Sequence, residues 1–296
     1  MSSFSNDYQI LKIHVANGVS TCTIHHKHPA CVMTNELSNE IRKFVTEAEG
    51  NNDVRVIVFK SADPDFFIAH FDVTAIIEWA ENPTAARFGP EQVNKVKKNG
   101  VSGGYRETIK NSRKVWIVEM AGRAGGGGNE FAAACDMRFG LKGKTKINQM
   151  EVPLGILPGG NGTINLPKLI GRNRALEVIL GGVDVDAETL EKWGYLNRIF
   201  PSRESLSAHV DGFAKRIAQF PAIAVGHAKQ SVVNALSFDM PHAEALKQEF
   251  LLFADLLRDP SSLKLMKAFI ELKGGQTRLG ELKVNELAPY LEFSKL

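Results

Sequence analysis

A run of four consecutive glycines, residues 125–128, follows closely on a strongly apolar segment and constrains this chain more than any other feature. The apolar segment, residues 115–121, has the length and composition of a buried strand. Glycines at such a point predict a tight turn from strand into helix, because glycine adopts backbone conformations that other residues avoid. The short helix expected at about residues 129–136 would direct its positive end, with unshielded N–H groups, toward an anion or a developing oxyanion.

Strand and helix patterns alternate over the first two thirds of the chain. A hairpin is predicted between Tyr8 and Ile24, with its turn at Asn17-Gly18. A helix is predicted over residues 34–48 and a buried strand over residues 54–59. Further helical patterns cover residues 71–80, 90–110 and 166–180. This alternation predicts an α/β core.

Past Pro201 the strand patterns stop. Helical patterns cover residues 206–219, 223–236, 242–257 and 263–272, separated by proline or glycine. We therefore expect residues 1–200 to form an α/β core with the active site and residues 201–296 to form a helical oligomerisation region.

Composition limits the classes of partner. The 36 Lys and Arg residues nearly balance the 33 Asp and Glu residues, and the surplus of +3 is too small and too scattered to indicate nucleic acid. The basic cluster Lys95-Val96-Lys97-Lys98 is typical of a solvated helix face. No apolar stretch approaches the ~20 residues of a membrane span, so no membrane partner is expected. A small or moderately anionic ligand fits better.

No metal site and no nucleotide fingerprint is predicted. The three cysteines lack a Cys-x-x-Cys pair, and neighbours among His25, His26 and His28 would point to opposite faces of a strand. A dinucleotide fingerprint starting at Gly125 would need glycine where Glu130 stands. A P-loop at residues 143–145 would need glycine where Arg138 stands.

Two glutamates are the candidate acid and base groups. Glu130 lies just after the glycine run, where a lone carboxylate could simply complement the helix dipole. Glu151 lies in a loop that can fold back over the same turn. Two carboxylates that face one oxyanion pocket are suited to general acid and base catalysis.

Residues 66–72, 122–136 and 151–169 resemble, in order, three signatures of the crotonase superfamily, the enoyl-CoA hydratases and isomerases. The likeness extends from about Tyr8 to Lys273. It implies an α/β crotonase-like spiral of strand-strand-helix units with a C-terminal helical layer that assembles a homotrimer or a hexamer.

The resemblance also implies a site. The backbone N–H groups of Ala69 and Gly127 would form an oxyanion hole for an acyl-CoA thioester, with His70, Gly126 and Gly128 adjacent to the substrate. His70 departs from the family, which most often has glycine at that position. No metal or redox cofactor would be needed, because coenzyme A arrives as part of the substrate.

Because the hydratases carry glutamates at the positions of Glu130 and Glu151, the resemblance favours reversible hydration of a trans-2-enoyl-CoA. Glu130 would help to activate water and Glu151 would move the α-proton. The alternatives are a Δ3-Δ2 enoyl-CoA isomerase, or an acyl-CoA hydrolase or decarboxylase on the same fold. A non-catalytic acyl-CoA- or RNA-binding relative is the alternative of another class.

Two further expectations concern the end of the chain. Phe269 and Lys273 resemble family residues that hold the nucleotide portion of CoA. The last three residues, Ser294, Lys295 and Leu296, match the tripeptide that the peroxisomal import receptor reads. The sequence therefore predicts a peroxisomal enzyme of fatty-acid β-oxidation or of a specialised acyl pathway.

Overall fold

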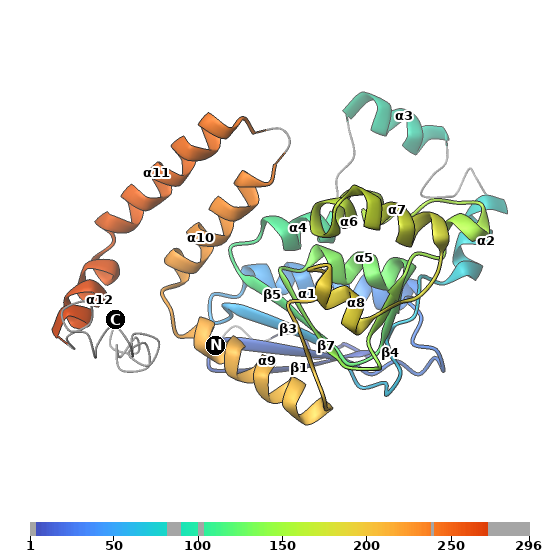
Figure 1. Cartoon of the computed structure of the whole chain (residues 1–296), viewed down its shortest axis with the longest axis horizontal. Helices are drawn as coiled ribbons and strands as arrows, with labels where there is room; N and C mark the ends of the chain where they lie inside the picture. Colours follow the sequence, from blue (N-terminus) through green and yellow to red (C-terminus); the bar gives the residue numbers. More distant parts are fainter. Residues whose placement is uncertain (1–3, 82–89, 100–103, 238–239, 272–296) are drawn as a thin grey trace.

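A computed structural model describes residues 4–81, 90–99, 104–237 and 240–271 of the chain. Its centre is a six-stranded sheet with the order β1-β2-β3-β5-β7-β10 (Figure 1). Only β1 and β2 are antiparallel, and the remaining neighbours are parallel. The strands are β1 (Leu11–Ala16), β2 (Val19–Ile24), β3 (Val56–Ser61), β5 (Val115–Met120), β7 (Met137–Leu141) and β10 (Arg198–Phe200).

The predicted hairpin is confirmed. Ala16 pairs with Val19, so Asn17 and Gly18 form a two-residue turn. Both turn residues have positive φ angles, 51° and 77°, as a turn that matches the twist of the two strands requires. The predicted buried strands at residues 54–59 and 115–121 are β3 and β5.

A second, four-stranded sheet has the order β4-β6-β8-β9. Its members are β4 (Phe66–Ile68), β6 (Arg123–Gly125), β8 (Lys146–Asn148) and β9 (Val185–Asp186). The sequence patterns did not reveal these strands, because two or three residues are too few to show alternation. They matter for function. Because β4, β6 and β8 run parallel, the chain segments that follow these three strands lie at the same edge of the small sheet.

Helices cover the two faces of the central sheet. On one face lie α1 (Asn35–Gly50) and α5 (Gly126–Ala134), where Phe44, Phe59 and Phe131 form edge-to-face ring contacts. On the other face lies α9 (Arg203–Ala218). Residues from α9 and from β3 and β5 share a second buried cluster, so α9 packs against the sheet although it follows residue 200 in the chain.

Two predicted helices are divided in the structure. The pattern over residues 90–110 corresponds to α3 (Pro90–Asn99) and α4 (Gly104–Asn111). The pattern over residues 166–180 spans α6 (Gly162–Ile170) and α7 (Arg172–Gly181). Gly171 separates these two with a φ angle of +82°, a conformation that ends a helix. The other elements of this region are α2 (Val73–Glu81), the 3₁₀ helix η1 (Val152–Leu154) and α8 (Ala187–Lys192).

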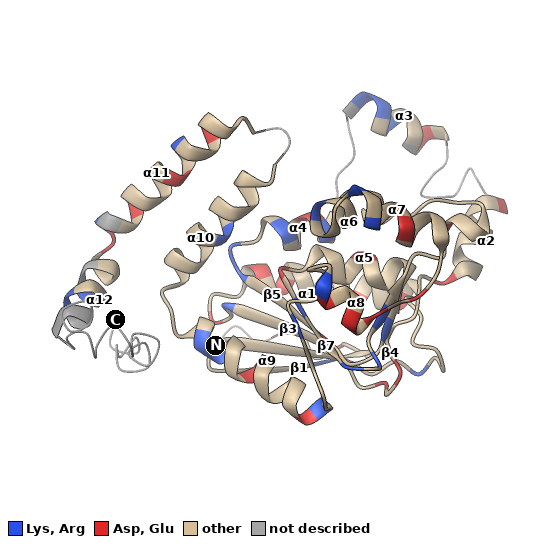
Figure 2. Ribbon diagram, in the orientation of Figure 1, with Lys and Arg blue, Asp and Glu red and all other residues tan. Residues whose placement is uncertain are grey.

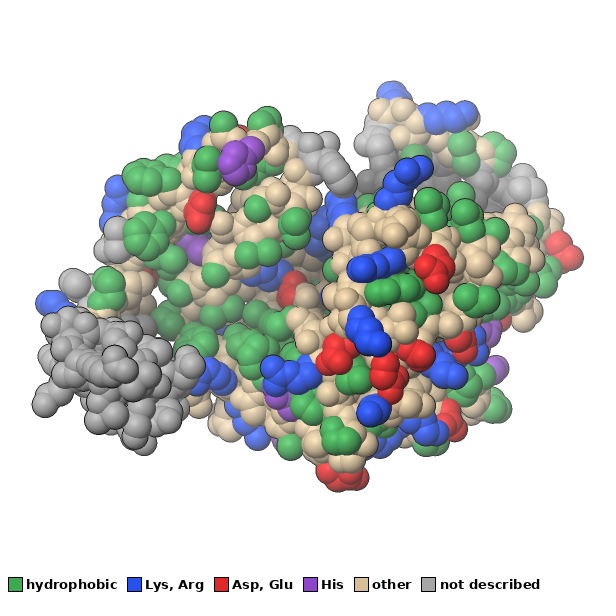
Figure 3. Space-filling view, viewed as in Figure 1, with side chains coloured by type: hydrophobic (Ala, Val, Ile, Leu, Met, Phe, Trp, Pro, Cys, Tyr) green, Lys and Arg blue, Asp and Glu red, His purple; other side chains and the backbone are tan. Residues whose placement is uncertain are grey.

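The last described helices extend to one side of the sheet (Figure 1). They are α10 (Ala222–Ala235), α11 (His242–Arg258) and α12 (Pro260–Glu271), in agreement with the predicted helices. Their surface is rich in apolar side chains (Figure 3), and Phe250 and Phe253 are 70% and 59% exposed. Basic and acidic residues are interspersed along the elements (Figure 2). Within the described ranges, no helix is long and apolar enough to cross a bilayer.

Candidate active site

The glycine run forms the start of α5. Gly125 is the extended N-cap, and the helix begins at Gly126 rather than near residue 129. The N–H groups of the first turn therefore have no acceptor within the helix. This earlier start also corrects the expected position of Glu130, which lies in the second turn rather than the first.

Glycine is required here because another chain segment approaches very closely. A β-carbon on Gly127 would lie 3.0 Å from Phe71 Cβ and 3.4 Å from the Phe71 backbone nitrogen. A β-carbon on Gly128 would lie 2.8 Å from Ile68 Cβ. The start of α5 is thus packed against the segment that follows β4, as the family signatures implied.

The amide that meets Gly127 belongs to Phe71 and not to Ala69. The Ala69 N–H already donates to the Cys31 carbonyl at 3.1 Å, so the prediction that it faces an oxyanion is wrong. Met33 holds the segment from the side, since it donates to the His70 carbonyl at 2.7 Å and accepts from Asp72 at 3.1 Å. Among the described residues, the Phe71 N–H has no acceptor.

Glu130 is 4% exposed and is held by two backbone amides. Its Oε1 accepts hydrogen bonds from Gly160 at 2.7 Å and from Gly162 at 3.0 Å. Both donors lie in or beside the Gly/Pro-rich connection that precedes α6. These bonds leave Oε2 without a hydrogen-bond partner among the described residues.

Glu151 is 9% exposed and lies close enough to Glu130 for the two charges to interact. A β-carbon on Gly126 would lie 2.8 Å from Glu151 Oε1, so this carboxylate lies over the first turn of α5. Burial, and then the negative charge of Glu130, raise the pKa of Glu151 to about 7. A carboxyl group with this pKa can both give and take a proton near neutral pH.

A buried chain of side chains leads to Glu151. The Tyr195 hydroxyl donates to Asn129 Oδ1, and Asn129 Nδ2 donates to Gln149 Oε1 at 2.7 Å. Gln149 Nε2 then donates to Glu151 Oε2 at 3.4 Å. Sequence reasoning missed Gln149 and Tyr195, because only the folded chain brings these positions together. Asn129, next to Glu130, gave no separate chemical signal.

His70 lies next to this arrangement. Its Nδ1 is 2.7 Å from the Phe71 carbonyl oxygen, and because a carbonyl only accepts, Nδ1 carries the hydrogen. Its Cβ lies 3.7 Å from the β-carbon position of Gly126. The structure thus brings together Gly126, Gly127, Gly128, Glu130, Glu151 and His70 of the predicted site.

The remaining predicted residues are not placed. Phe269 lies on α12, but its side chain is outside the described part of the chain, as are Lys273 and the terminal tripeptide. No group of three potential metal ligands occurs in the described ranges.

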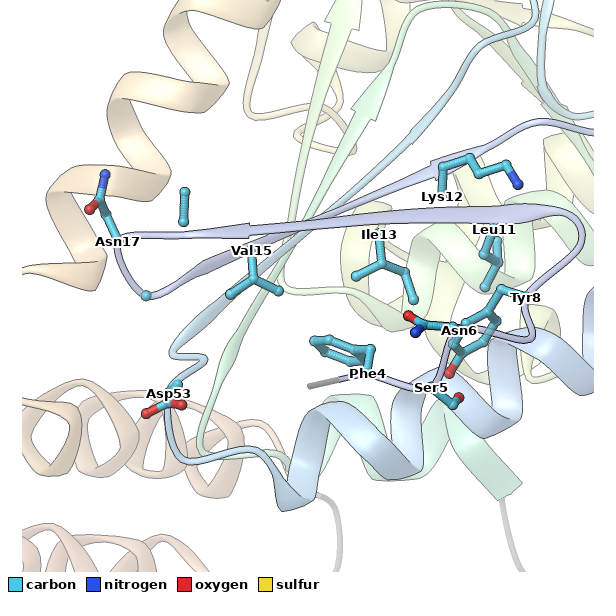
Figure 4. Close-up of a pocket in the computed structure, with 12 residues that line it drawn as sticks. Phe4, Ser5, Asn6, Tyr8, Leu11, Lys12, Ile13, Val15, Asn17 and Asp53 are labelled. Atoms are coloured by element: carbon cyan, nitrogen blue, oxygen red, sulfur yellow. The ribbon is translucent and has the colours of Figure 1, made fainter. Parts of the chain in front are cut away.

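A groove of about 650 Å³ lies elsewhere, between the amino-terminal segment and the β1–β2 hairpin (Figure 4). Phe4, Tyr8 and Ile13 line it, and neither Glu130 nor Glu151 does.

A model of the enoyl-CoA hydratase/isomerase family matches residues 14–276. The chain belongs to this family. Membership in the enoyl-CoA hydratase/isomerase family confirms the predicted crotonase relationship and the predicted enzyme class.

Individual known proteins match most of the chain. The "Probable enoyl-CoA hydratase echA8" of Mycobacterium bovis is 27% identical over 91% of this chain and 98% of its own length. The crystal structure of the enoyl-CoA hydratase from Bacillus anthracis has a TM-score of 0.75 at 25% identity, over 89% of this chain and 96% of that one. Pseudomonas aeruginosa DspI has a TM-score of 0.77 at 25% identity, over 92% and 97%. These likenesses confirm the crotonase-like α/β fold.

Proposed function

We propose that this protein catalyses reversible hydration of a 2-enoyl-CoA thioester. The observation that carries the proposal is a pair of buried carboxylates at α5: Glu151 lies over the first turn of the helix, and the negative charge of Glu130 in the second turn is close enough to raise the pKa of Glu151. The family membership supports the same class of reaction.

In this proposal the N–H groups of Phe71 and Gly127 hold the thioester oxygen. Neither amide has an acceptor among the described residues, and they lie together where negative charge would develop as the enolate forms. Donors of this kind contribute on the order of 3–4 kcal/mol each to the stability of a transition state. His70 would hold the Phe71 carbonyl and so fix the orientation of the peptide next to this donor.

Glu130 and Glu151 carry out different proton transfers. Glu130 takes a proton from water while the water oxygen bonds to C3, and the electrons of the double bond move into the enolate. Glu151, which is half protonated near pH 7, gives its proton to C2 as the enolate collapses. A proton then returns from Glu130 to Glu151 through solvent, so the sum is addition of one water. Every step uses residues of this chain, with coenzyme A present only as part of the substrate.

Migration of a double bond is the second candidate. A carboxyl group that titrates at about pH 7, as Glu151 does, can carry a proton between C2 and C4 without help from Glu130.

The decisive experiment follows loss of the conjugated thioester absorbance of crotonyl-CoA and longer 2-enoyl-CoAs. We expect hydration by the native protein, and a fall of about 10²–10⁴-fold in kcat for Glu130→Gln and for Glu151→Gln. If the native protein hydrates none of these thioesters but converts a 3-enoyl-CoA to its 2-enoyl isomer, and Glu130→Gln retains that activity, the second candidate replaces the first.

We propose a peroxisomal location, supported by Ser294, Lys295 and Leu296 at the end of the sequence. A fluorescently tagged copy should enter peroxisomes, and removal of the three residues should leave it in the cytosol. An unchanged distribution would contradict this proposal. The proposed CoA contacts of Phe269 and Lys273 are tested separately, by measuring the KM of the Lys273→Ala variant for crotonyl-CoA.

A further inference from the structure

Arg106 on α4 lies beside Glu130. A β-carbon on Gly160 would clash with Glu130 Oε2 and would lie 3.0 Å from Cζ of Arg106. The guanidinium and the free oxygen of Glu130 therefore border the same glycine. Arg106 is half-buried, and its plane lies over the ring of Tyr105, 4.8 Å from the centroid.

The guanidinium forms no ion pair with the described residues, although the Glu130 carboxylate lies near it. None of the ion pairs formed by described residues includes Arg106, so no carboxylate oxygen of theirs lies within 4.0 Å. Its Nε is buried without a hydrogen bond to any described residue, and Nη2 makes one hydrogen-bond contact with them, to the sulfur of Met33 at 3.9 Å. Sulfur is a weak acceptor, so most of the donors remain unused.

A second arginine near the core shows the usual arrangement. Arg138 donates from Nε to the Tyr195 carbonyl at 2.8 Å, and from Nη1 to the carbonyls of Cys135 and Ala132 at 2.7 and 3.2 Å. Nε and Nη1 of Arg138 thus donate to backbone carbonyls, whereas no nitrogen of the Arg106 guanidinium donates to an oxygen of the described residues. A half-buried cation with unused donors next to a reaction site is suited to bind an anion that comes with the substrate.

We infer that Arg106 binds a carboxylate carried by the acyl group, so that the preferred substrate is a 2-enoyl-CoA derived from a dicarboxylic acid. This inference rests on the proposed function. With the thioester oxygen at Phe71 and Gly127 and C3 at Glu130, the acyl atoms beyond C3 pass Glu130 and reach Arg106. An apolar acyl chain would cover the guanidinium without pairing its charge, which is unfavourable.

The carboxylate specificity can be tested by binding alone. Glutaryl-CoA and butyryl-CoA are saturated, so neither is hydrated, and they differ only by the carboxylate at the end of the acyl chain. We expect glutaryl-CoA to bind the native protein at least tenfold more tightly. Arg106→Gln should remove this preference because it weakens the binding of glutaryl-CoA, while the Kd of butyryl-CoA should change less than about twofold. Arg106→Lys should show part of the preference for glutaryl-CoA. Arg198→Gln, a change at an exposed arginine, should bind both thioesters as the native protein does.

Unchanged butyryl-CoA binding also shows that the variant is folded. If the native protein binds butyryl-CoA as tightly as glutaryl-CoA, the inference is overturned.

Turnover separates this inference from the proposed function. The native protein should hydrate glutaconyl-CoA with a lower KM than crotonyl-CoA, and Arg106→Gln should raise only the KM for glutaconyl-CoA. An equal fall in kcat for both substrates, with no change in KM, would overturn the inference and would show that Arg106 acts on Glu130. Hydration of neither thioester, with the glutaryl-CoA preference intact, would overturn the proposed function and leave the carboxylate site in place.

Discussion

Glu151 is the residue whose titration links the site to the stability of the fold. Its pKa is 4.5 in the unfolded chain and about 7 in the folded protein. The folded state therefore keeps a proton that the unfolded state has lost, and stability falls as the pH rises from about 4.5 through about 7. The difference of pKa corresponds to about 3 kcal/mol.

We expect Glu151→Gln to remove most of this pH dependence, so that its free energy of unfolding exceeds that of the native protein at pH 8 more than at pH 5. Urea unfolding at both pH values measures the effect. Glu244→Gln is a suitable control, because Glu244 lies on the surface of α11 and should leave the pH dependence unchanged. Parallel curves for the native protein and Glu151→Gln would contradict the buried titration.

Individual site residues could be predicted from the sequence where the residue type alone indicates its chemical role. Glu130 was identified because it follows consecutive glycines at a predicted strand-to-helix turn, and Glu151 because its loop could fold back over that turn. Gly127 was identified through the family resemblance. The oxyanion donor was misplaced by two residues, since the choice between Ala69 and Phe71 depends on which amide pairs with Cys31. Arg106 and Gln149 had no signal, because their roles arise from contacts between distant segments.

At the scale of elements, α10 is fixed to the core by one buried lysine. Lys229 donates to the carbonyls of Ile109 and Lys114 at 3.0 and 2.9 Å and to Asp136 Oδ2 at 2.8 Å. Lys229→Met should destabilise the protein by about 3–5 kcal/mol, because the largely buried Asp136 carboxylate loses its cationic partner and keeps only the Trp116 N–H, and two carbonyls lose their donor. Urea unfolding at one fixed protein concentration measures this loss.

The exposed ion pair between Lys247 and Glu244 provides the control. Lys247→Met should have little effect on unfolding, since exposed pairs contribute little. Equal effects of Lys229→Met and Lys247→Met would show that the buried contacts do not hold α10.

Elements that are long and periodic were predictable, and short ones were not. The helices after residue 201 were located from apolar spacing and from the prolines and glycines between them. The division at Gly171 escaped detection because the apolar pattern continues across it. The strands of the small sheet are defined by pairing with distant segments, which a local pattern does not contain.

At the scale of the whole molecule, the surface of α10 and α11 is unusually apolar. A groove of about 580 Å³ lies between them, lined by Leu246, Phe250, Phe253 and neighbouring residues. Exposed apolar surface of this kind is typical of protein interfaces, which supports the proposed homotrimer or hexamer. Phe253→Asp should shift the protein toward monomers in analytical ultracentrifugation, while Val15→Asp on β1 should not. A native protein that is monomeric at micromolar concentration would contradict the proposed assembly.

The position of α9 has a consequence for biosynthesis. One face of the central sheet is closed only when Leu206, Val210 and Ala214 arrive, and these follow every strand of that sheet along the chain. While the nascent polypeptide leaves the ribosome, Val56, Val58 and Ile117 therefore remain uncovered until after residue 200. This interval is when the chain is most prone to aggregate and when a chaperone has most to protect.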